Sequence, residues 1–256
     1  MHIVCIHAHP DDAEILAGGT LALLAGSGHA VTIISMTPGD CGSATHSARE
    51  ISAIRQKEAA AAATVIGAEY QCAQFRDMSI FNNDESRRRV TELIRATRPD
   101  VILTASPEDY HCDHEATSIL VRDASFAASA PNYLTKAKKP AAPLHAIRHL
   151  YYVDPIGGVD RRGSDIRPHF LVNVKSTFKL KSKMLDAHES QRDWLKRQHG
   201  IDDPIREMER WTRSRGKFAR IEYGEGFRQY KGHPFPTTPL LEDLLGSKVV
   251  PLNAAH

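Results

Sequence analysis

Residues 3–14 read IVCIHAHPDDAE, a short apolar run followed at once by two histidines and three carboxylates around one proline. Four consecutive apolar residues before a turn are typical of a strand that is buried on both faces of a parallel sheet. The adjacent carboxylates of Asp11 and Asp12 repel each other and are costly to bury without a cation, a proton or hydrogen-bond donors. The stretch therefore predicts a first strand that ends either in a solvated turn or in a metal site.

Strands and helices are expected to alternate along the rest of the chain. Further strands are expected at residues 30–36, 71–75, 101–104, 149–154 and 170–174, and helices at residues 14–25, 48–66, 84–97, within 107–128, 176–198 and 204–219. This alternation predicts an α/β fold of the Rossmann-like type, with a mostly parallel sheet flanked by helices on both faces.

The length and composition indicate one globular domain over residues 1–256, since 41% hydrophobic residues suffice for a substantial core. We expect a core over residues 1–195, followed by a C-terminal helical extension and tail over residues 196–256. The tail carries prolines and then apolar residues from Pro234 to Leu245. Such a segment packs either on its own domain or on a neighbouring subunit, and we expect a homo-oligomer, a trimer or hexamer.

The charge pattern excludes several classes of partner. A formal net charge of +2 gives no basic field that would attract nucleic acid. No apolar run approaches the roughly 20 residues that span a bilayer, and the N-terminus lacks the pattern of a signal peptide. The four cysteines form no Cys-x-x-Cys pair and are too sparse for a disulfide framework. We expect a cytoplasmic protein that acts on a small molecule.

A second polar cluster, EDYHCDH at residues 108–114, follows the expected strand at residues 101–104. In a doubly wound sheet of strand order 3-2-1-4-5, the first and fourth strands are neighbours, and a crevice opens beyond their carboxyl ends. His9, Asp12 and His114 would then offer two nitrogens and one oxygen to a divalent cation. Three protein ligands and one open position are typical of catalytic zinc.

Simpler interpretations exist for each cluster alone. A single histidine near a strand end is usually a surface residue, and Asp-Asp after proline is commonly a helix N-cap with an acidic first turn. Two histidines and a carboxylate are also the ligands of non-haem iron oxygenases, although those sites usually lie on antiparallel barrels. No Gly-x-Gly-x-x-Gly motif follows the first strand, so no nucleotide cofactor is expected.

Four stretches together resemble the LmbE-like, PIG-L-type zinc deacetylases, which remove the acetyl group from N-acetylglucosamine conjugates. They are AHPDDAE…GGTLA, RQKEAA, RPDVILTASPEDYHCDHEAT and HESQ, in that order within residues 1–195. The paired His-Pro-Asp-Asp and His-x-Asp-His motifs are specific, whereas GGT or HESQ alone is a weak signal. Cys112 stands where the family usually has proline, and Asp40 stands where glutamate is commoner.

The resemblance implies one zinc ion per subunit, although other divalent cations would also fit. It matches His9, Asp12 and His114 to the metal ligands and Asp11 to the general base. The implied reaction is hydrolysis of the acetamide of an N-acetylglucosamine-type sugar or glycoconjugate. A carbohydrate-binding member of the fold without catalytic activity is the alternative.

The resemblance also assigns roles around the metal. It matches His111 to the residue that polarises or protonates the tetrahedral intermediate, and Asp113 to a carboxylate that orients a histidine. Asp40, Arg55 and Asp77 fall at sugar-binding positions of the family. Arg55 has a second interpretation, as a partner of a glutamate one turn along a solvated helix face.

Overall fold

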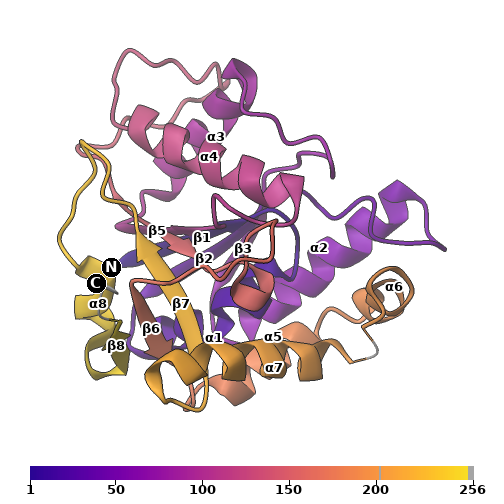
Figure 1. Cartoon of the computed structure of the whole chain (residues 1–256). Helices are drawn as coiled ribbons and strands as arrows, with labels where there is room; N and C mark the ends of the chain where they lie inside the picture. The colour runs from indigo at the N-terminus through magenta and orange to yellow at the C-terminus, as the bar shows by residue number, and fades with distance from the viewer. Residues whose placement is uncertain (202, 253–256) are drawn as a thin grey trace.

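The computed structural model describes residues 1–201 and 203–252, which form one sheet covered by helices (Figure 1). The strands are β1 (His2–His7), β2 (Ala30–Ser35), β3 (Glu69–Cys72), β4 (Val101–Thr104), β5 (His149–Val153), β6 (Phe170–Asn173), β7 (Gly224–Gln229) and β8 (Val249–Pro251). The helices are α1 (Asp12–Gly26), α2 (Ala48–Thr64), α3 (Asp84–Thr97), α4 (Cys112–Ala127), α5 (Phe178–Asp186), α6 (Ser190–His199), α7 (Pro204–Gly216) and α8 (Leu240–Leu245). Short 3-10 turns are η1 (Ile156–Gly158), η2 (Lys217–Ala219) and η3 (Gly246–Lys248).

The sheet has the strand order β3-β2-β1-β4-β5-β7-β6-β8. Its first five strands are parallel, and β7, β6 and β8 extend it with antiparallel pairings. The predicted α/β fold and the order 3-2-1-4-5 of the parallel strands are therefore confirmed. Because β1 pairs directly with β4, in a register that aligns Ile6 with Thr104, the two polar clusters leave the sheet side by side.

Helices cover both faces of the sheet, with α3 and α4 on one face and α1, α5 and α7 on the other (Figure 1). Successive side chains of β1 point to opposite faces of the sheet and contribute to the hydrophobic core on each face. Ile3 and Cys5 belong to the cluster with α1, whereas Val4 and Ile6 belong to the cluster with α3 and α4. Full burial on both sides explains why this strand is apolar at every position from residue 3 to residue 6.

The long helix expected at residues 176–198 is instead two helices, α5 and α6, joined by a turn around His188. The carboxylate of Glu58, on α2, accepts hydrogen bonds from the backbone nitrogen of Ser190 at 2.8 Å and from its hydroxyl at 2.6 Å. These tertiary bonds hold the first turn of α6 against α2. Helical periodicity continues across the break, which is why the sequence pattern did not reveal it.

The C-terminal segment is part of the sheet and the core. The predicted helical extension also contains β7, which lies between β5 and β6, and β8 at the sheet edge. Leu241 and Leu245 of α8 are buried in the same core cluster as α1, and Phe235 is buried in the opposite cluster. Of the two expected alternatives, the tail therefore packs on its own domain, which covers its largest apolar side chains.

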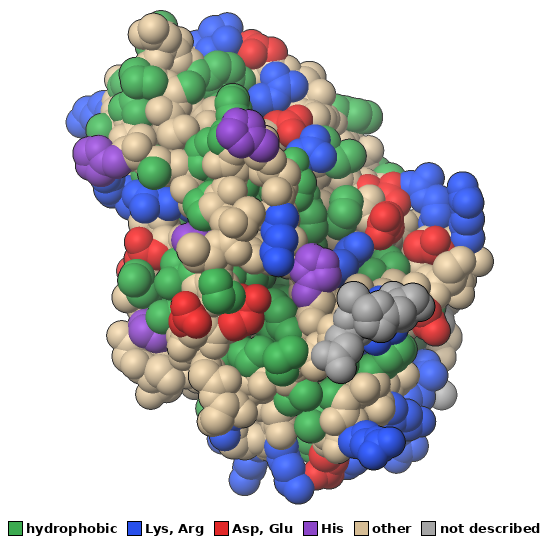
Figure 2. Space-filling model, turned by 60° about the vertical axis from the view of Figure 1, so that its left-hand side comes forward, with side chains coloured by type: hydrophobic (Ala, Val, Ile, Leu, Met, Phe, Trp, Pro, Cys, Tyr) green, Lys and Arg blue, Asp and Glu red, His purple; other side chains and the backbone are tan. Residues whose placement is uncertain are grey.

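The surface agrees with the low net charge. On the face shown in Figure 2, basic and acidic side chains are interspersed around a central histidine and a group of hydrophobic side chains. Within the described residues, none of the helices combines the length and apolar character needed to cross a membrane.

Candidate active site

The site lies where β1 and β4 end. His9 and Asp12 come from the turn that connects β1 to α1, and His114 comes from the first turn of α4, which follows β4. Three of their atoms form a nearly equilateral triangle. The Nδ1 of His9 lies 3.4 Å from the Oδ2 of Asp12, the Nε2 of His114 lies 3.3 Å from the same oxygen, and the two nitrogens are 3.3 Å apart.

This triangle has the dimensions of a zinc site. A tetrahedral ion about 2.0–2.1 Å from its ligands holds those ligands about 3.3–3.4 Å from one another. The donors are two imidazole nitrogens and one carboxylate oxygen, which zinc accepts readily. The residues present therefore fit a tetrahedral divalent cation with a fourth position open toward the cavity.

Two further carboxylates orient the imidazoles. The Nε2 of His9 donates a hydrogen bond to Asp113 at 3.1 Å, and the Nδ1 of His114 donates to Asp109 at 3.1 Å. Both carboxylates are 1% exposed. Each ring thus presents its other nitrogen to the triangle, as metal-binding histidines usually do. Sequence reasoning missed Asp109, although it lies within the EDYHCDH stretch.

The electrostatics of the three donors favour added positive charge. Burial by itself would lower the pKa of His9, but hydrogen bonds to Asp113 and Asp12 raise it to about 9. Burial also opposes a charged His114, yet Asp12 and Asp109 raise its pKa well above its usual range. Burial would raise the pKa of Asp12, and His114 and His9 hold it well below its usual range. A divalent cation would supply this positive charge in place of the two protons.

Asp11 is not one of the three donors of the triangle and is held by Arg55. Its backbone is left-handed, with φ at 103°, which is rare for a residue other than glycine and is found most often at functional sites. Asp11 occupies the N-cap position of α1, but its side chain makes no capping bond. Instead, the Nη2 of Arg55 donates to the Asp11 carboxylate at 3.2 Å and to the carbonyl of Pro10 at 2.6 Å.

Burial of the Arg55–Asp11 pair changes the pKa of Asp11. Arg55 is only 4% exposed, so its interpretation as a residue on a solvated helix face is wrong. Burial raises the pKa of Asp11 to about 6, and the charge of Arg55 opposes that rise. A carboxylate with a pKa near neutrality is suited to accept a proton during catalysis.

His111 is at the N-cap position of α4, and its Nδ1 accepts a hydrogen bond from the backbone nitrogen of Asp113 at 3.1 Å. In the neutral ring the proton therefore sits on Nε2. Burial lowers the pKa of His111, and the charges of His9 and His114 lower it further. His111 thus offers an N–H donor, and its ligand nitrogen lies within 4.8 Å of those of His9 and His114.

A cavity of about 390 Å³ opens beside these groups. Seven of the nine predicted site residues line it, namely His9, Asp11, Asp12, Arg55, Asp77, His111 and His114. Asp113 lies behind His9. Asp40 is not in the wall either, and it accepts a hydrogen bond from the backbone nitrogen of Asp77 at 2.8 Å. The walls also contain Tyr110 and Trp194, which sequence reasoning did not select, although Tyr110 lies in the same EDYHCDH stretch.

Asp77 lines the cavity, and only part of its hydrogen-bonding capacity is used. Its Oδ2 accepts a hydrogen bond from the backbone nitrogen of Cys41 at 2.8 Å. Its Oδ1 is buried and has no hydrogen-bond partner within the described part of the chain. A buried acceptor without a partner costs free energy unless a ligand satisfies it.

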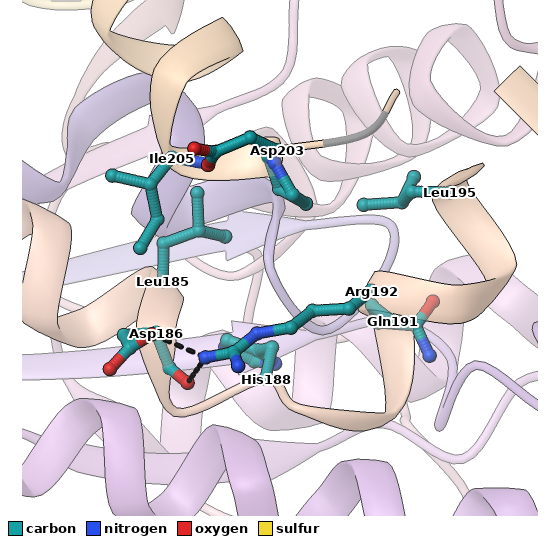
Figure 3. Close-up of a pocket in the computed structure, with 9 residues that line it drawn as sticks. Leu185, Asp186, His188, Gln191, Arg192, Leu195, Asp203 and Ile205 are labelled. Atoms are coloured by element: carbon teal, nitrogen blue, oxygen red, sulfur yellow. Dashed lines mark hydrogen bonds and ion pairs between the residues drawn. The ribbon is translucent and has the colours of Figure 1, made fainter. Parts of the chain in front are cut away.

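A neighbouring cavity of about 310 Å³ lies between the turn that joins α5 to α6 and the start of α7 (Figure 3). Gln191 and Leu195 line both this cavity and the one at the metal triangle. His188, also in its wall, lies 3.4 Å from Glu14 in the first turn of α1. The HESQ stretch therefore reaches the site through α6, which the sequence pattern alone did not indicate.

The chain is similar to known proteins in sequence and in fold. The profile of the PIG-L family, GlcNAc-PI de-N-acetylase, matches residues 4–125. The diacetylchitobiose deacetylase of Thermococcus kodakarensis is 26% identical over 197 residues, which are 74% of this chain and 69% of that protein. The crystal structure of N,N'-diacetylchitobiose deacetylase from Pyrococcus horikoshii superposes with a TM-score of 0.75 at 25% identity, over 93% of this chain and 88% of the other.

A relative of different activity is also similar. The 4-oxalmesaconate hydratase of Pseudomonas putida is 27% identical over 146 residues, which are 54% of this chain and only 57% of the relative's length. The matched residues 4–125 contain most of β1, the whole of β4 and both polar clusters. Over these residues the chain therefore matches the PIG-L (LmbE-like) family.

Proposed function

We propose that the protein is a metal-dependent hydrolase that removes the acetyl group from an N-acetylglucosamine-type sugar or glycoconjugate. The observation that carries the proposal is the donor triangle of His9, Asp12 and His114, with Asp11 and His111 beside it in one cavity. The deacetylase relatives support it. The ligand set favours zinc, one ion per subunit.

We propose the following roles for the residues of the site in amide hydrolysis. A divalent cation at the triangle would polarise the acetyl carbonyl and lower the pKa of the attacking water. Asp11 accepts a proton as the water oxygen bonds to the carbonyl carbon, and the Nε2–H of His111 donates a hydrogen bond to the resulting oxyanion. Asp11 then returns the proton to the amine nitrogen, the C–N bond breaks, and acetic acid and the free amine leave. The acid releases its remaining proton to solvent and becomes acetate.

The polar groups of the wall would bind the sugar. We propose that the free Oδ1 of Asp77 accepts a hydrogen bond from a sugar hydroxyl, and that Asp40 fixes Asp77 through its backbone. Arg55 lines the same cavity and holds Asp11 in place. It would contact the sugar only with nitrogens that Asp11 and Pro10 do not use.

Acetate release tests the proposal. Protein loaded with zinc is incubated with a panel of N-acetylglucosaminyl compounds, and 4-oxalmesaconate is offered in parallel because a hydratase is among the relatives. We expect acetate release and no hydration. Hydration without acetate release would overturn the deacetylase in favour of a hydratase. Sugar binding without either reaction would favour the carbohydrate-binding alternative, and a requirement for oxygen would favour an iron oxygenase.

The ligand set has its own test. His114→Ala removes one of three donors, so metal content and activity should fall together. Asp109→Asn leaves the donors in place but weakens the orientation of His114, and we expect about a 10–100-fold loss of metal affinity. Full metal content in purified His114→Ala would overturn the assignment.

Assembly and location also remain proposals. We propose a homo-oligomer, a trimer or hexamer, but the buried C-terminal segment does not supply its interface. Light scattering at micromolar concentration tests this, and a monomer would refute it. The four free cysteines agree with a cytoplasmic location, where thiols stay reduced.

A further inference from the structure

A third cavity, of about 500 Å³, adjoins the one at the metal triangle. Ile15, Tyr110, Ile156 and Leu195 line both cavities, so they form a shared boundary between them. Beyond this boundary the wall consists of Gly200, Ile201, Pro204, Glu207, Arg210 and Trp211. We call this space the α7 cavity, because most of that wall belongs to α7 or precedes it directly.

The two cavities differ in chemistry. The cavity at the triangle is lined by histidines, aspartates and Arg55, which suit a polar sugar. Among the described residues, most side chains that line the α7 cavity are apolar, and its two charged side chains pair with each other, since Arg210 lies 2.6 Å from Glu207. A sugar ring placed there would leave most of its hydroxyls without partners, whereas an apolar group would be well matched.

The shared walls place the α7 cavity next to the cavity at the metal triangle. Tyr110 packs edge to face on His111 and His114, with ring centroids 5.7 and 5.6 Å away, and the residue as a whole is 54% exposed. Leu195 projects from α6 toward the stretch that begins α7 (Figure 3). A sugar at the triangle would therefore have its neighbouring substituent next to Tyr110, Leu195 and Trp211.

We propose that the α7 cavity is a subsite for an uncharged apolar aglycone, an alkyl or aryl group linked to the N-acetylated sugar. The inference rests on the proposed deacetylase function and names the substrate class more closely, as an apolar glycoside rather than a free sugar or a second polar sugar. The wall beyond the shared boundary is contributed by residues 200–211, outside the part of the chain that the family profile matches.

The first test compares two substrates that differ only in the aglycone. The methyl and octyl glycosides of N-acetylglucosamine are assayed below the micellar concentration of the latter. Burial of even two methylene groups raises kcat/KM by about 10-fold, so we expect the octyl glycoside to be preferred by at least this factor. Equal kcat/KM values for the two substrates would overturn the subsite.

Variants of the cavity wall test whether the preference for the octyl glycoside arises in the α7 cavity. Trp211→Ala removes the largest apolar wall, and the octyl-to-methyl ratio of kcat/KM should fall several-fold. Ile201→Ser is a second variant, in case the loss of the indole impairs folding. Phe126→Ala is the matched control, because Phe126 is also an exposed aromatic residue but lies on α4 and lines neither cavity. A ratio that persists in both cavity variants would contradict the proposal.

Binding can be measured without hydrolysis. The chain has two tryptophans, Trp194 in the wall of the first cavity and Trp211 in that of the α7 cavity. In Trp194→Phe, the emission reports Trp211 alone. Octyl glucoside, which has no acetamide, should shift this emission to shorter wavelength in a saturable manner. A shift without acetate release from any substrate would support the subsite and overturn the deacetylase, whereas acetate release without a shift or an octyl preference would overturn only the subsite.

Discussion

At the scale of single residues, Asp11 and Asp12 show how two adjacent carboxylates can be stabilised by different partners. The turn after Pro10 sends Asp12 toward His9 and His114, while the left-handed backbone of Asp11 sends its carboxylate toward Arg55. Imidazoles stabilise one negative charge and a guanidinium stabilises the other. This separation allows one side chain to bind a cation while its neighbour serves as a base.

The two substitutions should therefore fail differently. Asp11→Asn keeps all three donors, so the variant should retain zinc and bind substrate but lose about 10²–10⁴ in kcat. Asp12→Asn should lose metal affinity first and recover part of its activity in excess zinc. Metal content by elemental analysis and kcat on the best substrate distinguish the two.

The opposite pattern would reverse the two roles. If Asp11→Asn empties the site while Asp12→Asn stays metallated and inactive, Asp11 is the ligand. If both variants remain active, the stretch is only a turn and the deacetylase proposal fails with it.

His7 gives the protein a pH-dependent stability. It is 1% exposed, and burial lowers its pKa to about 4. Because this lies below the value near 6.5 of an unfolded chain, the stability from neutral His7 is fully present above pH 6.5 and is lost as the pH falls toward 4. Between pH 6.5 and 4.5, the free energy of unfolding of the wild type should fall by about 2 kcal/mol more than that of His7→Asn.

Urea unfolding with a chelator present measures this difference, because metal release then contributes to neither protein. Asn is the matched replacement, since the Nε2 of His7 has no hydrogen-bond partner among the described residues. Parallel pH profiles for the two proteins would show that His7 titrates alike in the folded and unfolded states.

At the scale of the elements, α1 is shaped by close contacts rather than by helix propensity. Gly19 lies in its interior, where glycine costs about 1 kcal/mol relative to alanine. A Cβ at Gly19 would lie 2.6 Å from the Cβ of Val174. The backbone nitrogens of Gly19 and Thr20 donate to the buried carboxylate of Glu225 at 2.9 and 2.7 Å, and Lys181 pairs with that carboxylate at 2.6 Å. The helix is thereby fixed against β7 and α5.

A pair of glycines in α1 tests this packing. Gly19→Ala should destabilise the fold by about 1–3 kcal/mol, because the new methyl group forces Val174 to move. Gly26→Ala is the control in the same helix, since a Cβ there would meet nothing within 4 Å, and it should be neutral or stabilise by about 0.5–1 kcal/mol. Chemical denaturation of both variants measures the difference, and equal effects would exclude close packing as the reason for Gly19.

At the scale of the whole molecule, the C-terminal segment completes the domain that carries the site. Leu241 is fully buried, its backbone nitrogen donates to the hydroxyl of Tyr151 at 3.1 Å, and that hydroxyl donates to Glu242 at 2.8 Å. The N-terminus of the chain lies beside α8 (Figure 1). Residues far along the chain therefore stabilise the central strands.

Loss of Leu241 should affect the entire fold. Leu241→Ala is expected to cost about 2–5 kcal/mol, as for other buried leucines, whereas Asp243→Ala on the exposed side of α8 should cost less than about 0.5 kcal/mol. Thermal and urea unfolding provide the measurement. A Leu241→Ala protein as stable as the control would mean that α8 is dispensable to the domain.

The sequence alone determined the parallel half of the fold and the pair of polar clusters. Runs such as Ile3–Ile6 and Val101–Thr104 are apolar throughout because both faces of a central parallel strand are buried, and helices between them leave local signals in capping and periodicity. Strand order then follows from a general rule of such sheets, so the approach of His9 and His114 was predictable.

Only the tertiary structure decided what depends on contacts between distant segments. The break between α5 and α6 is fixed by Glu58 of α2, the place of β7 by pairing with β5 and β6, and the burial of α8 by the core beneath it. The support of Asp11 by Arg55, 44 residues along the chain, likewise depends on how the folded chain directs the two side chains. Local sequence patterns indicate the secondary structure that one segment favours. These contacts form only when several segments pack together, because the free energy of the whole fold determines them.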